Sequence, residues 1–210
     1  FGSGFKIAMR DLELRGAGNL LGAEQSGCME SVGYDLYIKI LEDAVNAEKG
    51  ISVPSVRDCL IDININAYIA EDYISSSQQR IEVYRKIAHL ESAEERDDLL
   101  DELSDRYGEL PPPVSNLVDI SLLRNAASLL GFTSVEQKGV LLSFYADAPD
   151  MERIAALAML PELRGRITAS AGKRGHFSYR LEKGENSLTA AHRVLSLYTK
   201  LSQKGIDKSE

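Results

Sequence analysis

The sequence predicts an α+β fold in which a cluster of helices accompanies a small mixed or antiparallel sheet. Three observations lead to this prediction: apolar and polar residues alternate over 61–69, three helical stripes follow one another over 75–131, and strand-like runs interrupt the helical pattern over 140–181. The 210 residues suffice for one large domain or two small ones, and 44% hydrophobic with 27% charged residues is typical of a folded globular chain.

A helix is expected over Tyr34–Val45, with Gly50 placed to end it. A strand over 61–69 follows a short linker around Pro54. Successive side chains of a strand point to opposite faces, so a period of two predicts one buried face and one face in water. The apolar members of the alternation are Ile61, Ile63, Ile65, Ala67 and Ile69.

Three helices are expected next. Ser75–Ser77 offer N-caps to the first, and a capping box at Ser92–Glu95 opens the second, which Gly108 closes. Prolines 111–113 suit the first turn of the third helix, which stops at Gly131. Their apolar stripes are, in order, Ile81, Tyr84, Ile87 and Ala88; Leu99, Leu100 and Leu103; and Leu117, Val118, Leu122 and Leu129.

The last third of the chain changes character. Residues 140–146 predict a buried strand, and Asp150 caps a helix that runs to about Leu160. Residues 166–170 and 176–181 flank a Gly-Lys-Arg-Gly turn as a hairpin. Asn186 caps a final helix that continues through Leu188, Val194, Leu195, Tyr198 and Leu201.

The net charge of −8 is distributed unevenly. Residues 71–110 hold twelve acidic and five basic side chains, whereas residues 151–210 hold eleven basic and six acidic ones. The negative total argues against a protein whose whole surface binds nucleic acid. Each run has two interpretations: a solvated face, or a docking surface for a partner of opposite sign.

The chain carries no pattern that predicts catalysis, a metal site or a bound cofactor. It has no phosphate-binding loop of the Gly-x-x-x-x-Gly-Lys-Ser/Thr type, and His89, His176 and His192 lack partners at metal-ligand spacing. Cys28 and Cys59 are expected to be free thiols. No run approaches the roughly 18 apolar residues of a membrane span, so we expect a cytoplasmic protein without a membrane partner.

The most specific segment is GFKIAMRDLELRGAGNLLGAEQSG over residues 4–27. It resembles the translocation motif shared by the RecG helicase and the bacterial transcription-repair coupling factors, which follows the last helicase motif of the second motor lobe. VGYDLY over 32–37 and DRYGELP over 105–111 are similar to the coupling factors rather than to RecG. The resemblance covers most of the chain and weakens beyond Gly131.

This resemblance implies that residues 1–50 are the loop-helix tail of a RecA-like motor lobe and that residues 51–210 form a C-terminal regulatory domain. The family translocates on double-stranded DNA at the expense of ATP, displaces stalled RNA polymerase and recruits the excision-repair protein UvrA. Its C-terminal domain masks the N-terminal UvrA-binding domain of the same chain. Because the sequence begins at Phe1, we expect a fragment whose parent binds ATP and magnesium in motor lobes outside it.

Within the motif, Arg15 and Gln25 match the positions that the resemblance implies couple ATP hydrolysis to translocation. Arg10 lies just upstream and is expected to contribute through a phosphate contact or through packing. The alternative for each is a hydrogen bond that caps a helix or stabilises a turn.

The acidic helix after the capping box is the candidate for an interdomain clamp. Asp98, Glu102 and Asp105 are separated by four and three residues and therefore share one helical face, while Leu99 and Leu103 point toward the core. Our hypothesis is that Glu102 and Asp105 pair with basic residues of the masked domain. The alternative is a helix face that meets only water.

Two other functions compete. The basic hairpin over 164–183 predicts an autonomous nucleic-acid-binding module, in which Phe177 and Tyr179 stack on bases between Lys173, Arg174 and Arg180. The other alternative is a purely structural cap on the motor lobe.

Overall fold

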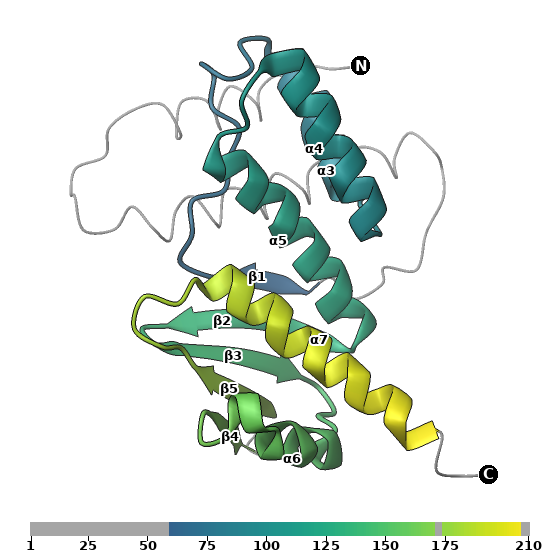
Figure 1. Ribbon diagram of the computed structural model, residues 1–210, viewed down its shortest axis with the longest axis vertical. Coiled ribbons are helices and arrows are strands. Elements are labelled where there is room, and N and C mark those ends of the chain that lie inside the picture. The colour runs from purple at the N-terminus through teal and green to yellow at the C-terminus, as the bar shows by residue number, and fades with distance from the viewer. Residues whose placement is uncertain (1–58, 171–173, 207–210) are drawn as a thin grey trace.

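The computed structural model describes residues 59–170 and 174–206, and for residues 202–206 it describes only the backbone. A helical cluster stands above a five-stranded sheet, and a long C-terminal helix lies along the sheet (Figure 1). The α+β prediction is confirmed. The helices and strands, in chain order, are β1 Leu60–Asp62, α3 Ser77–Ala88, α4 Ala93–Tyr107, α5 Pro112–Leu129, β2 Phe132–Lys138, β3 Leu141–Ala146, α6 Met151–Met159, a 3-10 turn Pro161–Leu163, β4 Ile167–Ser170, β5 His176–Arg180 and α7 Ser187–Ile206.

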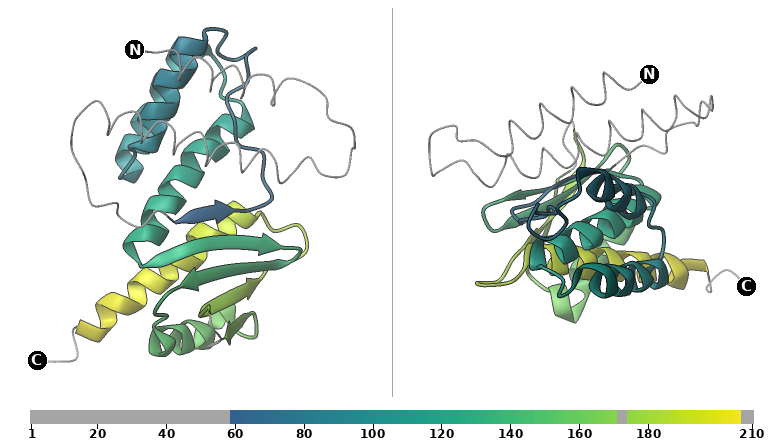
Figure 2. Two further views of the ribbon diagram at one scale, coloured as in Figure 1. Left: turned by 180° about the vertical axis from the view of Figure 1, so that it is seen from behind. Right: turned by 90° about the horizontal axis from the view of Figure 1, so that it is seen from above.

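The sheet is mixed, with the strand order β1-β2-β3-β5-β4. Strand β1 runs parallel to β2, and the other neighbouring strands are antiparallel. Seen from behind, the sheet lies in front of α5 and α7, so both helices cover the same face (Figure 2). The predicted hairpin is the pair β4–β5, in which Ile167 lies opposite Tyr179.

The predicted helix boundaries are confirmed because the expected side chains cap them. Ser76 Oγ, Ser92 Oγ, Asp150 Oδ1 and Asn186 Oδ1 accept from the backbone N–H three residues further on, at 2.9–3.4 Å. In the capping box, the Glu95 carboxylate accepts from the N–H of Glu91 rather than from that of Ser92. Gly108 and Gly131 end α4 and α5 at φ values of 89° and 81°, where a side chain would be strained.

The strand predicted over 61–69 is wrong beyond Asp62. Ile61, Ile63, Ala67 and Ile69 are buried as the alternation predicts, yet only Leu60–Asp62 pair with β2. Two residues beyond Asp62, the N–H of Asn64 donates to the side-chain oxygen of Gln137 at 2.9 Å, and the N–H of Ile65 donates to Ile63 O at 3.0 Å. These bonds divert the chain from the sheet into the helical cluster.

Strand β2, Phe132–Lys138, was not predicted. A register shift between Phe132 and Ser134 lets both Phe132 and Val135 reach the core, which breaks the period of two by which the strand would have been recognised.

Aromatic rings form the core between the sheet and α7. The rings of Phe144 and Phe177, on neighbouring strands, stack at 4.7 Å with an interplanar angle of 9°. The ring of Phe132 lies edge-on to both, and that of Tyr198 from α7 covers Phe132 and Phe177. The hairpin, the β-bulge and α7 therefore depend on one another for packing.

Replacing Phe144 by alanine should lower the free energy of unfolding by about 3–5 kcal/mol, because Phe144 is fully buried and its neighbours cannot collapse into the cavity. Urea unfolding followed by circular dichroism measures the change. Leu129→Ala, at a side chain that is 75% exposed on α5, is the control and should change stability by less than about 0.5 kcal/mol. Equal effects of the two substitutions would contradict this account of the core.

Candidate interdomain surface

Helix α4 is two-sided, as its sequence predicts. Leu99 and Leu103 are buried against the helical cluster, while Asp98 and Asp105 are exposed on the opposite side. Glu102 lies between these sides and is partly buried.

The outward side of α4 carries a longer row of carboxylates than the three predicted residues. Glu94, Asp98, Asp101 and Asp105 follow one another at steps of four, three and four residues, which places them on one face, and all four are exposed. Within the described residues none of the four makes an ion pair. We call these four residues the acidic row. Glu94 and Asp101 were not among the predicted clamp residues, although their spacing from Asp98 carries the same signal.

Glu102 is engaged within the domain. Lys86 Nζ, on α3, lies 2.6 Å from Glu102 Oε2, and Arg106 Nη1 lies 2.9 Å from Oε1. These hydrogen bonds, first from Lys86 and then from Arg106, lower the pKa of Glu102 below its ordinary value. Glu102 therefore joins α4 to α3. The sequence could not reveal this, because Lys86 lies on a different helix.

A second ion pair joins α4 to α5. Arg96 Nε donates to Asp119 Oδ1 at 2.6 Å, and Arg96 Nη1 donates to Asp97 at the same distance. Because α4 is tied to α3 through Glu102 and to α5 through Arg96, the acidic row is presented on a fixed helix.

The basic hairpin does not present the aromatic rings that were predicted to stack on nucleic acid. Phe177 and Tyr179 are fully buried, because alternate residues of β5 face the core. Arg174 packs on the protein itself: its guanidinium donates to Glu136 Oε1 and Ser134 Oγ at 3.1 and 3.0 Å, and lies 4.3 Å from the centre of the Tyr145 ring. Lys173 lies outside the described residues. The nucleic-acid interpretation therefore loses the stacking residues on which it depends.

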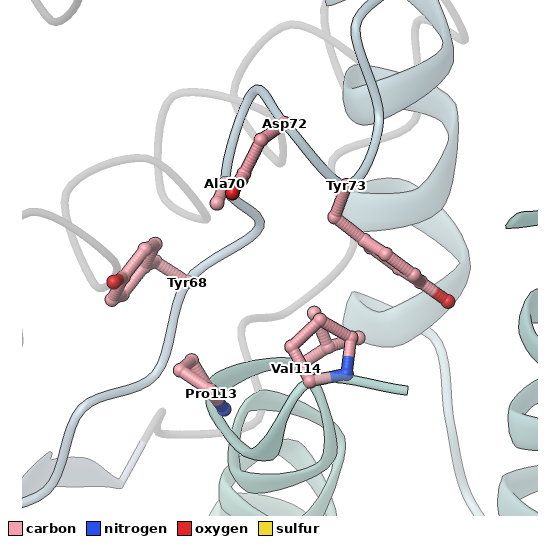
Figure 3. Close-up of a pocket in the computed structure, with 7 residues that line it drawn as sticks. Tyr68, Ala70, Asp72, Tyr73, Pro113 and Val114 are labelled. Atoms are coloured by element: carbon pink, nitrogen blue, oxygen red, sulfur yellow. The ribbon is translucent and has the colours of Figure 1, made fainter. Parts of the chain in front are cut away.

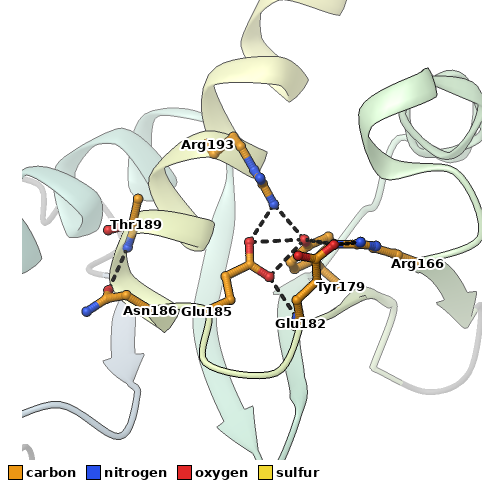
Figure 4. Close-up of polar contacts among 7 residues, drawn as sticks. All are labelled: Arg166, Tyr179, Glu182, Glu185, Asn186, Thr189 and Arg193. Carbon is orange, nitrogen blue, oxygen red and sulfur yellow. Dashed lines mark hydrogen bonds and ion pairs between the residues drawn. The ribbon is translucent and has the colours of Figure 1, made fainter.

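The hydroxyl of Tyr179 lies at the centre of a polar cluster that closes the hairpin (Figure 4). It donates toward the Glu185 carboxylate at 3.1 Å and accepts from Arg193 Nη2 and Arg166 Nη1 at 2.5 and 3.0 Å. Arg166 also pairs with Glu182. Arg166 is thus engaged within the domain, and the cluster joins the hairpin to α7 through Arg193.

The other candidate residues either form no metal site within the described ranges or lie outside those ranges. Over 59–170 and 174–206, no group of three or more His, Cys, Asp or Glu side chains could hold a metal ion. Nor is any helix in those ranges long and apolar enough to cross a membrane. Arg10, Arg15 and Gln25, the expected helix around Tyr34–Val45 and Cys28 lie outside the described residues.

The family comparison fits this architecture. Residues 63–155 match the model of the TRCF domain. The chain contains a TRCF domain. Its fold is similar to a crystal structure of the C-terminal domain of a transcription-repair coupling factor, with a TM-score of 0.58, 20% identity, and coverage of 72% of this chain and 96% of that one.

Two relatives of this chain come from staphylococci. It is 42% identical over 155 residues to the transcription-repair-coupling factor of Staphylococcus aureus strain USA300, which covers 73% of this chain and 13% of that protein. It is 45% identical over 140 residues to the protein of the same name from Staphylococcus epidermidis, covering 66% of this chain and 12% of that protein. The chain thus spans about an eighth of the length of these relatives.

Neutralising Glu102 with Glu102→Gln should lower the free energy of unfolding at pH 7 by about 0.2–1 kcal/mol, the range for partly exposed ion pairs. The folded pKa of Glu102 is depressed, so its contribution is present above the unfolded pKa of about 4.3 and is lost as pH falls through the folded value. Urea unfolding between pH 3 and pH 7 should show the two proteins converging at the acid end.

Asp105→Asn is the matched control, since it removes one charge from the same helix but no ion pair of the described residues. Its difference from the parent should stay within about 0.5 kcal/mol. A Glu102→Gln difference that does not shrink toward acid pH would contradict a stabilising role for this pair.

Proposed function

We propose that this chain is the regulatory C-terminal part of an ATP-dependent translocase on double-stranded DNA, which displaces stalled RNA polymerase and recruits nucleotide excision repair through UvrA. In this proposal the TRCF domain docks on the UvrA-binding domain of the same protein and masks it until the motor engages. The family match and the similarity to transcription-repair-coupling factors support it.

The observation that carries the proposal is the acidic row on α4. A releasable interface between domains is expected to be modest in area and polar, because a large apolar interface would not open. The acidic row meets this requirement: its four carboxylates are exposed, make no ion pair within the described residues and lie on a helix fixed at two points. Basic residues of the masked domain are the complementary partner.

Glu102 contributes to the same contact in a second way. A carboxylate offers about four lone-pair positions, and three are occupied by bonds from Lys86 and Arg106. In the docked state Glu102 accepts one further donor from the partner domain while it continues to hold α3 against α4.

Reversing charge in the acidic row should weaken binding of this chain to the separately expressed UvrA-binding domain. Asp98→Lys together with Asp105→Lys is expected to raise Kd at least tenfold at low salt, because like charges placed opposite one another are repulsive. Calorimetric titration at two salt concentrations measures this effect, and the affinity of the parent chain should fall as salt rises.

The control is Glu162→Lys, which reverses an exposed charge in the 3-10 turn that follows α6. Helix α6 lies at the opposite end of the domain from α4 (Figure 1). It should leave Kd unchanged. In the full-length protein, the substitutions in the acidic row should increase UvrA binding without motor engagement. Equal Kd values for parent and row variant, or no binding at all, would contradict the masking proposal.

We also propose that the translocation motif couples the motor lobes to DNA, with Arg15 and Gln25 transmitting the state of ATP hydrolysis and Arg10 supporting them. The full-length variants Arg15→Ala and Gln25→Ala should therefore hydrolyse ATP yet fail to displace a triplex-forming strand from duplex DNA. ATP and magnesium would bind in the motor lobes, outside this chain. Variants that translocate at the parental rate would rule out this coupling role.

A further inference from the structure

A pocket of about 300 Å³ lies between the segment that leads into α3 and the start of α5. Tyr68 and Tyr73 stand on opposite sides of the hollow, with Asp72 and Ala70 along one rim and Pro113 and Val114 along the other (Figure 3). Such a volume is at the lower end of the range for small-molecule sites, so it suits one long side chain better than a cofactor.

The wall of this pocket is fixed by hydrogen bonds. The Tyr73 hydroxyl donates to Leu103 O at 3.1 Å, and its ring lies edge-on to that of Tyr107, with the centroids 5.9 Å apart. The Ile69 N–H donates to the Tyr84 hydroxyl at 3.0 Å, and Asn116 Nδ2 donates to Asn66 O at 2.9 Å. The pocket is therefore preorganised and is joined to the C-terminal half of α4.

The chemistry of the lining selects a cation rather than an anion. Pro112 and Pro113 have no N–H, and the N–H groups of Val114 and Ser115 already donate to Pro111 O, so the start of α5 offers an anion few donors. The Asp72 carboxylate is exposed on the rim and makes no ion pair within the described part of the chain. Two of the lining residues, Asp72 and Tyr73, belong to the stretch 71–110, which holds twelve acidic and five basic side chains.

The mixed lining selects arginine among cations. An arginine side chain has an apolar stem, which proline and valine can cover, and a planar guanidinium, which stacks on tyrosine and pairs with carboxylate. We propose that this pocket receives an arginine side chain of the basic surface that docks on the acidic row. This proposal rests on the masking function above and assigns it a specific anchor.

The first test uses the whole 210-residue chain and blocked arginine, N-acetyl-arginine amide, followed by ¹H–¹⁵N NMR. The amides of Ala70 and Val114 should shift in a saturable way. N-acetyl-citrulline amide, which has the same shape without the charge, should bind at least fivefold more weakly. Shifts confined to the acidic row, or equal responses to arginine and citrulline, would overturn the proposal.

Variants then locate the site. Asp72→Asn and Tyr68→Ala should each weaken blocked-arginine binding at least fivefold, whereas Tyr68→Phe keeps the ring and should bind normally. Both changed side chains are exposed, so the fold should be retained, which the spectra also report. Parental affinity in Tyr68→Ala and Asp72→Asn would overturn the proposal.

The second test separates this inference from the proposed function. The same pocket variants are titrated against the UvrA-binding domain beside the acidic-row variant. If the pocket variants and the acidic-row variant both bind the UvrA-binding domain more weakly, the result supports the pocket as an anchor. Weakening by the acidic-row variant alone overturns the pocket as an anchor and leaves masking intact. If the chain binds blocked arginine saturably but does not bind the UvrA-binding domain, the masking proposal is overturned. The assignment of an arginine of that domain as the occupant of the pocket is then overturned as well.

Discussion

The burial of α5 is the constraint on which the rest of the structure depends. One side of this helix packs on α3 and α4, and the other contacts α7, β1 and β2. Seven of its residues are buried, and the Ser121 hydroxyl donates to Ile87 O at 2.6 Å. Asp119 of the same helix binds Arg96 of α4 through its carboxylate, and its carbonyl oxygen lies 2.8 Å from His192 Nε2 of α7. The helical cluster and the sheet are therefore held in one body by a single helix.

This arrangement is consistent with the proposed docking of a partner on α4. Only Leu99 and Leu103 of α4 are buried, and most of its other residues are polar, so it lies at the edge of the cluster rather than within it. Its ion pairs to α3 and α5 fix its position, while the acidic row on the far side makes no ion pair with any residue that the structure describes. Acidic residues are concentrated in the stretch 71–110, which includes α4, and basic residues in the stretch 151–210, which includes the hairpin. In the proposed contact this asymmetry would favour one docking orientation over others.

Strand β5 of the hairpin contributes side chains both to the apolar core and to a polar cluster. Phe177 and Tyr179 face the core, where Tyr179 also serves as a polar junction for Arg166, Arg193 and Glu185. Several of the basic residues around this turn bind other side chains of the same domain. A positive count in the sequence is thus a poor guide to a nucleic-acid surface when the arginines have carboxylate and aromatic partners within the fold.

The sequence by itself determined the α+β class, the helix boundaries and the two-sided character of α4, because caps, proline positions and helical periodicity are local signals. It also carried the resemblance that predicted the family. Only the tertiary structure decided where the chain leaves the sheet after β1 and that Phe132–Lys138 is a strand. It also decided which carboxylates on α4 have partners, and it brought Tyr68, Tyr73 and Asp72 around one pocket. Each of these depends on contacts between residues far apart in the chain, such as Gln137 with Asn64 and Lys86 with Glu102, which no local pattern encodes.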